Sequence, residues 1–524
     1  MKSFIFRKKT GFLSLLISLL SVFIYRNILS DVGIGYMVCS YLVVTFIWMI
    51  LGSGFSDSMS RMVRSRLSKG QLSNAMNILS VSFVNQFLCG LLGGFLCGFL
   101  NYMIMNDVLH FPKGRFLGYY LCVYFFFRMI SEYFAGYAIV TGNEKAVSLA
   151  DALRELFRIV SGFIFMKMMY DKGLIVSALL MDEDIKYVYA VSGLFIGFCI
   201  SELLVCTFLF VIKFGMKLKS NGDFESLSSK DHALNIFINL WYRRLGNIVH
   251  GAVFCFVLLF VAARAVSAAS VGTAFNIIFE PFAISALIAL VFGASSSVNW
   301  VSCVRKKEKG NARIYFDFGI HIVVISSVFT AAFFASVSKL LIKLLVEDGA
   351  VMKNTDLILA VIASICYSVA LFSDQLCAMR DDRIPRIVAD ILSAAMTVLI
   401  CKLGTGPADS LFRILMIALM VYSVVNMIVW FVITYFRMNM VFDPLRNIMI
   451  PVVAGAVSAI GLLLITNVAA AHLGNLFTAL LCIPIGLLIF HAVLLLLRNY
   501  TESELKLMPL GGVIYGLGQI LRVM

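Results

Sequence analysis

Apolar residues run through this chain in long stretches that short polar segments separate. A bilayer core about 30 Å thick needs about 20 apolar residues per helix, and this criterion predicts fourteen membrane-spanning helices. Seven lie in the first half of the chain, at 11–29, 34–55, 77–105, 114–140, 148–170, 188–214 and 235–263. The other seven lie at 270–297, 314–345, 356–379, 384–403, 411–436, 445–470 and 474–497. The pattern therefore predicts an all-α polytopic membrane protein.

Two polar segments repeat at the same spacing along the chain. A shift of 239 residues superposes Gly54, Ser56, Ser58 and Arg66 on Gly293, Ser295, Ser297 and Arg305, and Ala150, Asp151 and Leu153 on Ala389, Asp390 and Leu392. The shift spans six helices, an even number, so the two copies cross the membrane in the same direction. We therefore predict two parallel six-helix lobes, 1–216 and 233–440, a cytoplasmic linker at 217–232, and two additional helices with a cytoplasmic tail at 441–524.

The composition excludes a soluble protein. Hydrophobic residues make up 61% and charged residues 14% of the chain, against about 45–50% and about 25% in soluble domains. The net charge is +14, and the predicted loops on the side of the N-terminus carry more than twice as many Lys and Arg as those on the other side. By the positive-inside rule both termini are predicted to be cytoplasmic, and no nucleic acid partner is expected.

The densest basic segment lies between the second and third predicted spans, where Arg61, Arg64, Arg66 and Lys69 fall within nine residues. We interpret this segment as an anchor that holds the loop in the cytoplasm. A second interpretation is contact with anionic lipid headgroups on the same side of the membrane.

Motifs of the common enzyme classes are missing from the sequence. It contains no P-loop, HExxH or GxSxG pattern, so no enzymatic activity is expected. The twelve cysteines form no CxxC pair. They are interpreted as small packing residues, and no metal and no cofactor is expected.

Ionisable residues inside the predicted spans are candidates for a functional site, because each costs about 2.5–3.5 kcal/mol on insertion. Arg128 and Glu132 are four residues apart on the fourth span, where an intrahelical ion pair is the alternative to substrate contact. On the fifth span, Arg154 and Arg158 are expected to extend to the cytoplasmic face. Glu280 lies beside the helix-breaking Pro281, which favours a functional role. The remaining candidates are Arg243, Arg264 and Asp374.

A family pattern is present in about the first 80 residues, which read YRNILSDVGIGYM, then a span, then GFSDSMSRMVRSRLSKGQLSNAMNIL. The chain resembles the stage V sporulation protein B and polysaccharide-flippase branch of the multidrug/oligosaccharidyl-lipid/polysaccharide (MOP) exporter superfamily. Its features match at Arg26, Gly33, Gly35, Ser58, Ser60, Arg66, Lys69 and Gly70. In the second copy, Ala294 stands where family members often carry a proline. Fourteen spans also suit lipid II flippases of the MurJ type.

The resemblance implies a protein of the bacterial cytoplasmic membrane whose cationic side chains bind an anionic lipid-linked saccharide diphosphate. Arginine suits this role because its planar group makes paired bonds to phosphate oxygens and stays charged. Arg26 on the first span matches in kind, and Arg243 and Arg264 on the seventh span are further candidates. The second span has no internal arginine, which favours a glycolipid other than lipid II.

We therefore expect a flippase that moves a lipid-linked oligosaccharide across the membrane by alternating access. Its partners would be membrane lipid, the polyprenyl-linked saccharide, and glycosyltransferases or a polymerase of the same pathway. The alternative is a cation-coupled (Na⁺ or H⁺) multidrug exporter of the MATE type, in which Glu280, Asp374 or Glu132 binds the ion. A third interpretation, a non-transporting subunit of a polymerising complex, leaves the buried charges unexplained. The expected substrate site comprises Arg26, Arg128, Glu132, Arg243, Arg264 and Glu280.

Overall fold

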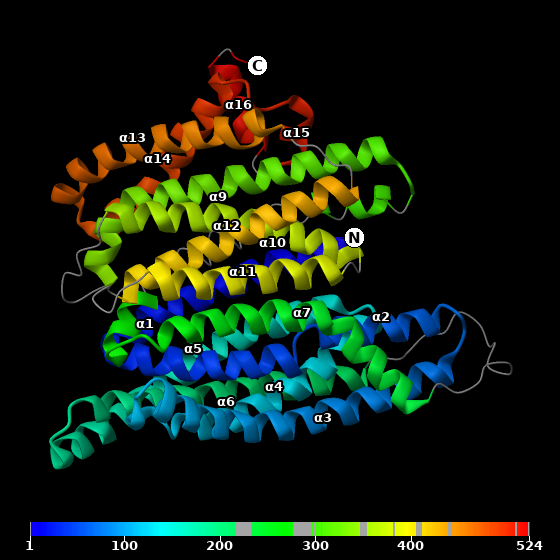
Figure 1. Ribbon diagram of the computed structural model, residues 1–524, viewed down its shortest axis with the longest axis vertical. Helices are drawn as coiled ribbons and strands as arrows, with labels where there is room; N and C mark the ends of the chain where they lie inside the picture. Colours follow the sequence, from blue (N-terminus) through cyan, green and yellow to red (C-terminus); the bar gives the residue numbers. More distant parts are fainter. Residues whose placement is uncertain are drawn as a thin grey trace. The chain divides into compact units, whose positions relative to one another are not determined.

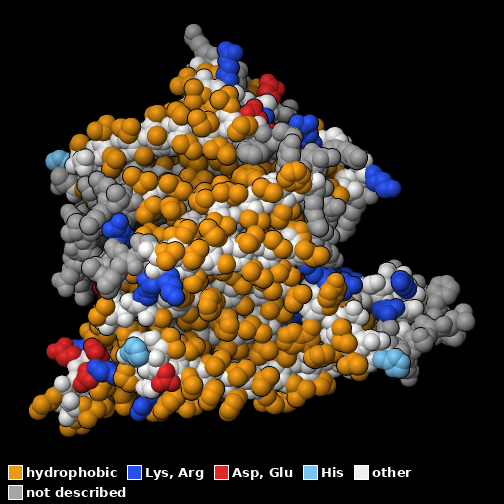
Figure 2. Space-filling view, in the orientation of Figure 1, with side chains coloured by type: hydrophobic (Ala, Val, Ile, Leu, Met, Phe, Trp, Pro, Cys, Tyr) orange, Lys and Arg blue, Asp and Glu red, His pale blue; other side chains and the backbone are white. Residues whose placement is uncertain are grey.

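Helices account for nearly all of the described chain, and the described residues contain no β-strand (Figure 1). The computed structural model describes residues 2–215, 232–275, 296–297, 299–304, 306–345, 354–380, 383–404, 411–438, 443–508, 511–521 and 523. Within this part, ten helices are long and apolar enough to cross a membrane. On the face drawn in Figure 2, hydrophobic side chains cover most of the described surface. The prediction of an all-α polytopic membrane protein is confirmed.

The chain divides into two compact units, Met1–Thr273 and Ala274–Met524. The helices of the first unit are α1 (Lys2–Leu51), α2 (Phe55–Leu67), α3 (Leu72–Met103), η1 (Ile104–Val108), η2 (Pro112–Gly114), α4 (Leu117–Val140), α5 (Glu144–Leu180), α6 (Asp184–Phe214) and α7 (Ala233–Ala262). Those of the second are α9 (Lys309–Leu345), α10 (Asn354–Arg380), α11 (Arg383–Gly404), α12 (Leu411–Met438), η4 (Leu445–Met449), α13 (Ile450–Leu473), α14 (Asn475–Leu496), α15 (Glu502–Leu507) and α16 (Gly511–Ile520). The division into lobes, linker and tail stays a prediction, and residues 217–231 of the linker lie outside the described residues.

α1 consists of two helical segments joined at Ser30, whose φ of 51° and ψ of −176° are not helical. In the first segment the Tyr25 hydroxyl donates to the Arg158 carbonyl of α5 at 2.7 Å. In the second, the Tyr41 ring packs edge-on against Phe198 of α6, and the Arg158 guanidinium lies 5.2 Å from the centre of the Phe198 ring. Because both segments reach the same level of α5 and α6, the chain reverses direction near Ser30, between the first two predicted spans.

The basic segment after the second span forms the helix α2, where the sequence predicted a loop. Gly54 precedes it with a φ of 67°, and a Cβ there would also collide with the Asn247 side chain. One face of α2 is buried in the core of the first unit. That face carries Phe55, Met59, Val63 and Leu67 at a spacing of four residues, which is typical of an amphipathic helix.

Helix order and packing repeat between the two units. α5 begins at Glu144 and α11 at Arg383, 239 residues later, and α3 and α4 begin 237 residues before α9 and α10. In the first unit α3 packs on α4, and both α4 and α5 pack on α6. In the second, α9 packs on α10, and both α10 and α11 pack on α12. The structure therefore supports the internal repeat.

α5 and α6 pack with their backbones in contact. A Cβ on Gly197 of α6 would lie 2.5 Å from the Gly162 Cα of α5. The Ser161 hydroxyl donates to the Gly197 carbonyl at 2.8 Å, and the Ser201 hydroxyl donates to the Arg154 carbonyl at 2.8 Å. Small residues let two helices approach this closely in a membrane protein.

The residues after α14, predicted as a cytoplasmic tail, form the helices α15 and α16 on the second unit. Tyr500, Leu505 and Ile514 are buried in the same core as residues of α9 and α14. These side chains therefore belong to the folded unit.

Glu504 of α15 joins this C-terminal segment to α9 and η4. Its carboxylate forms an ion pair with Arg446, lies 3.6 Å from His321 Nδ1, and accepts the Thr501 N–H at 3.0 Å. The Asn499 amide lies 2.9 Å from His321 Nε2. Burial raises the pKa of the Glu504 carboxyl, but the bonds from His321 and Thr501 and the charges of His321 and Arg446 outweigh it and lower the pKa to about 2.

Replacing Glu504 with glutamine is expected to lower the thermal unfolding midpoint near neutral pH and to have less effect in acid. The folded-state pKa of about 2 lies below the ordinary value of 4.5, so the carboxylate stabilises the folded state above pH 4.5. This stabilisation is lost as the pH falls from 4.5 toward 2. The midpoints of wild type, Glu504→Gln and the control Glu502→Gln are compared from pH 7 to pH 3. A difference between wild type and Glu504→Gln that does not change with pH would contradict the assignment.

A reporter that fluoresces only in the cytoplasm is expected to be bright when fused after Lys69 and after Lys309, and dark after Glu183. Lys69 lies in the turn before α3, Lys309 begins α9 and Glu183 directly precedes α6. The three fusions therefore sample both predicted sides of the membrane. Expression of each fusion is checked by immunoblot. A dark fusion at either lysine, or a bright one at Glu183, would show the predicted orientation to be wrong.

Candidate functional site

A buried charge network surrounds Glu202, a residue of α6 whose side chain is fully enclosed. Arg154 Nε of α5 donates to Glu202 Oε2 at 2.9 Å. From α4, the Ser131 hydroxyl donates to Glu202 Oε1 at 2.6 Å, and an Arg128 guanidinium nitrogen lies 3.7 Å from the same oxygen. The carboxylate thus ties α4, α5 and α6 together in the interior of the first unit.

Arg128 and Glu132 form the intrahelical ion pair that their spacing predicted, at 3.1 Å. Their side chains are 16% and 15% exposed, whereas that of Glu202 is inaccessible. The Arg128 guanidinium also lies 5.4 Å from the centre of the Trp48 ring, from α1. This pair is therefore the accessible edge of the buried network.

Arg154 points into the network, so the expectation that it extends to the cytoplasmic face is wrong. Its side chain is 7% exposed, and it binds Asp151 at 2.5 Å as well as Glu202. Arg158, one turn further along α5, pairs with Glu155 at 3.1 Å. Two carboxylates hold Arg154 inside, because their negative charges and acceptor oxygens offset the hydration that the buried guanidinium loses.

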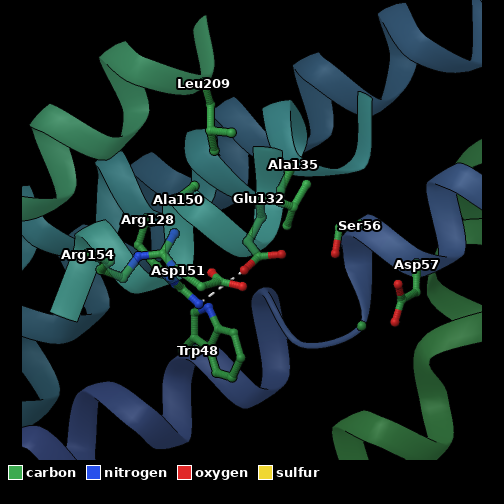
Figure 3. Close-up of a pocket in the computed structure, with 12 residues that line it drawn as sticks. Trp48, Ser56, Asp57, Arg128, Glu132, Ala135, Ala150, Asp151, Arg154 and Leu209 are labelled. Carbon is green, nitrogen blue, oxygen red and sulfur yellow. Dashed lines mark hydrogen bonds and ion pairs between the residues drawn. The ribbon is translucent and has the colours of Figure 1, made fainter. Parts of the chain in front are cut away.

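Two adjoining pockets open beside the network. The larger, about 220 Å³, is drawn in Figure 3, where Arg128, Glu132, Asp151 and Arg154 gather near the Trp48 ring. The smaller, about 180 Å³, shares Trp48, Arg128 and Arg154 with it. The smaller pocket is also lined by Tyr41, Tyr124, Glu155 and Arg158. Guanidinium donors, carboxylate acceptors and aromatic faces together suit a polar ligand with hydroxyl and phosphate groups.

Arg26 and Arg264, predicted for the same site, make other contacts within the first unit. Arg26 is buried and lies 3.8 Å from Asp31, a carboxylate that also accepts from the Thr273 hydroxyl at 3.1 Å. Arg264 lies after the end of α7, with its guanidinium 5.6 Å from the centre of the Phe260 ring.

One of the ion-coupling candidates, Asp374, belongs to the second unit. Asp374 of α10 is buried and accepts two hydrogen bonds from Arg386 of α11, one of them at 2.8 Å. Its carboxylate is therefore engaged by a fixed cation. Glu280 lies outside the described residues.

Arg243 lies in a separate pocket of the first unit, also about 220 Å³, together with Arg66 and Lys69. The structure thus brings Arg128 and Glu132 together at the network and assigns Arg243 to a second location.

Glu202 and Trp48 are among the residues of this site that the sequence analysis missed. Glu202 meets the criterion applied to the other candidates, because it is an ionisable residue inside a predicted span, 188–214. Trp48 lies at an ordinary helix position, and the sequence contains no signal that places its ring beside Arg128.

No protein-family model and no curated protein matches this sequence. Solved structures do match its fold. A structure of the lipid II flippase MurJ in an inward closed conformation has a TM-score of 0.62 at 13% identity, and the match covers 94% of this chain and 99% of that one. An inward-facing multidrug resistance MATE family transporter of the MOP superfamily has a TM-score of 0.59 at 14% identity, and the match covers 81% of this chain and 94% of that one. A MOP superfamily transporter from Pyrococcus furiosus has a TM-score of 0.59 at 13% identity, and the match covers 83% of this chain and 94% of that one.

Proposed function

We propose that this chain, which has the fold of the MOP superfamily, is a flippase for a lipid-linked oligosaccharide. The fold is the one expected for the superfamily that the motif in about the first 80 residues resembles. In the proposal the polar headgroup occupies a cavity, the polyprenyl tail stays in the lipid, and two lobes rock to open the cavity to either side.

We favour a flippase because the MurJ structure matches a larger share of this chain than the MATE transporter does. The MurJ structure matches 94% of this chain, whereas the MATE transporter matches 81% although it is itself 94% covered. The unmatched part is about the size of residues 441–524, the predicted additional helices and tail. A layout of six plus six plus two helices is the one that the resemblance associates with flippases.

The chemistry of the network supports a saccharide diphosphate as the ligand. Arg128 offers a charged donor for phosphate oxygens, and Glu132 and Asp151 are acceptors for sugar hydroxyls. Trp48 offers an aromatic face beside them. Arg26 and Arg264 remain candidates for the same substrate, and enzymes that build or polymerise the saccharide remain its proposed partners.

Cation-coupled multidrug export is the second candidate, and the charge balance of the network favours it. Glu132, Asp151, Glu155 and Glu202 surround three arginines, Arg128, Arg154 and Arg158. One carboxylate in excess suits a bound Na⁺ or H⁺. Glu132 and Asp151, each paired with an arginine as Asp374 is, are the candidates for such an ion in the network. Asp374 and Glu280 remain candidates beside them.

Transport by the purified full chain in proteoliposomes distinguishes the two functions. We expect the protein to move a fluorescent polyprenyl-diphosphate saccharide between leaflets, measured as label that becomes accessible to an impermeant quencher. We expect no accumulation of a fluorescent cationic drug under an imposed Na⁺ or H⁺ gradient. Drug transport without saccharide transport would overturn the proposal.

A further inference from the structure

A basic pocket of about 220 Å³ lies between α2, α3 and α7, away from the charge network. Ser65, Arg66 and Lys69 line it from the end of α2 and the turn that follows, and Asn235, Asn239 and Arg243 line it from α7. Its apolar lining is Met62, Ile78 and Ile236. We define these residues as the basic pocket.

The polar residues of the basic pocket form a polar stripe on one face of α7 and a second group at the end of α2 and in the turn that follows it. Asn235, Asn239 and Arg243 recur every four residues, so they share one face of α7. Ser65 lies near the end of α2 and Lys69 in the turn after it, and these five residues are all exposed. Because all of these side chains line one pocket, their donor groups border the same space.

The chemistry of this lining selects an anion. Three of the lining residues are cations, two are amides, and no carboxylate is among the described residues that line the pocket. Arg66 is held by a hydrogen bond from its guanidinium to the Gln71 side-chain oxygen at 3.1 Å. A phosphate group, with several charged acceptor oxygens, matches such a set of donors.

Next to the polar stripe, α7 presents an apolar face. Ile238, Tyr242 and Leu245 follow one another at helical spacing and are 53%, 61% and 40% exposed. Ile238 and Tyr242 each directly precede a residue of the polar stripe, Asn239 and Arg243, which places them about 100° around the helix from it. The apolar surface of α7 therefore borders its polar stripe. A ligand with a phosphate group and a hydrocarbon tail matches both surfaces.

We propose that the basic pocket binds the phosphate of an anionic membrane phospholipid, with its acyl chains along the exposed face of α7. The predicted cytoplasmic leaflet is where basic residues meet anionic lipids. The site is independent of the saccharide and of the charge network.

Native mass spectrometry of the purified full chain tests the proposal. The chain, in uncharged detergent, is titrated with phosphatidylglycerol and with phosphatidylcholine. We expect tighter binding of phosphatidylglycerol, and roughly tenfold weaker binding in Lys69→Gln and Arg243→Gln, because each removes a charge-assisted bond to phosphate. Asn239→Asp, which keeps size and all three cations but adds a negative charge, is expected to weaken binding at least as much.

The matched control is Lys145→Gln, which removes an exposed lysine at the start of α5, outside the basic pocket. It is expected to bind as the wild type does. Equal losses in Lys145→Gln and Lys69→Gln would show general charge attraction and overturn the site, as would unchanged binding in Asn239→Asp. Displacement of the lipid by inorganic phosphate at a similar concentration would overturn the lipid assignment in favour of a soluble phosphate ligand.

Discussion

Replacing Glu202 with alanine is expected to destabilise the first unit by about 3–5 kcal/mol, the usual cost of leaving a buried charge without its partner. Arg154 Nε bonds Glu202 at 2.9 Å and its side chain is 7% exposed, so the lost carboxylate leaves this buried cation with Asp151 as its remaining acidic partner. The Ser131 hydroxyl would lose its acceptor as well. Unfolding in a denaturing detergent titration, followed by tryptophan fluorescence, measures the change.

A surface pair provides the matched control. Glu183 is 89% exposed and lies 3.4 Å from Lys186, and such pairs contribute about 0–1 kcal/mol. Glu183→Ala should therefore change stability little. Replacing both partners of the buried pair, as in Glu202→Leu with Arg154→Met, should recover most of the loss, since a packed apolar pair avoids the stranded charge. Similar losses for Glu202→Ala and Glu183→Ala would contradict the burial argument.

Replacing Arg128 with glutamine is expected to reduce saccharide transport at least tenfold. Removing one member of a buried charge-assisted pair costs about 2–5 kcal/mol, and about 1.4 kcal/mol corresponds to a factor of ten. Arg128 lines both pockets beside the network, so a phosphate bound there would lose a charged donor. The leaflet-exchange assay in proteoliposomes measures the loss.

A second change separates ligand binding by Arg128 from its pairing with Glu132. Arg128→Gln alone leaves the Glu132 carboxylate without its 3.1 Å partner. The double variant Arg128→Gln with Glu132→Gln removes both charges, and it should restore stability but not transport. Recovery of transport in the double variant would mean that Arg128 serves the pair, and the proposed phosphate contact would be wrong.

The spans of the sequence analysis followed from apolar length, but α2 escaped that criterion. It is 13 residues long and contains four serines and three arginines, so hydropathy over a long window reads it as a loop. The spacing of Phe55, Met59, Val63 and Leu67 is a helical signal that a shorter window would have detected. Gly54, which directly precedes α2, marks the start of this helix, and hydropathy alone does not show it.

Pairing between helices explains why the candidate site was predicted in part. Arg128 and Glu132 are neighbours on one helix, so spacing alone brings them together. Arg154 and Glu202 are 48 residues apart and meet only because α5 packs on α6. Without that packing, a lone arginine near a span end is best explained by an extended side chain, as the sequence analysis assumed for Arg154.

The backbone contact between α5 and α6 would limit how the first unit can deform in the proposed transport cycle. Sliding one helix along the other would drive Gly197 against Gly162 and break the serine bonds to both backbones. A packed contact of this kind resists gradual shear. The two helices are therefore expected to move as one rigid unit. The bending required by the proposed alternating-access cycle must then occur elsewhere in the first unit. One such place is Ser30, where the backbone already departs from helical geometry.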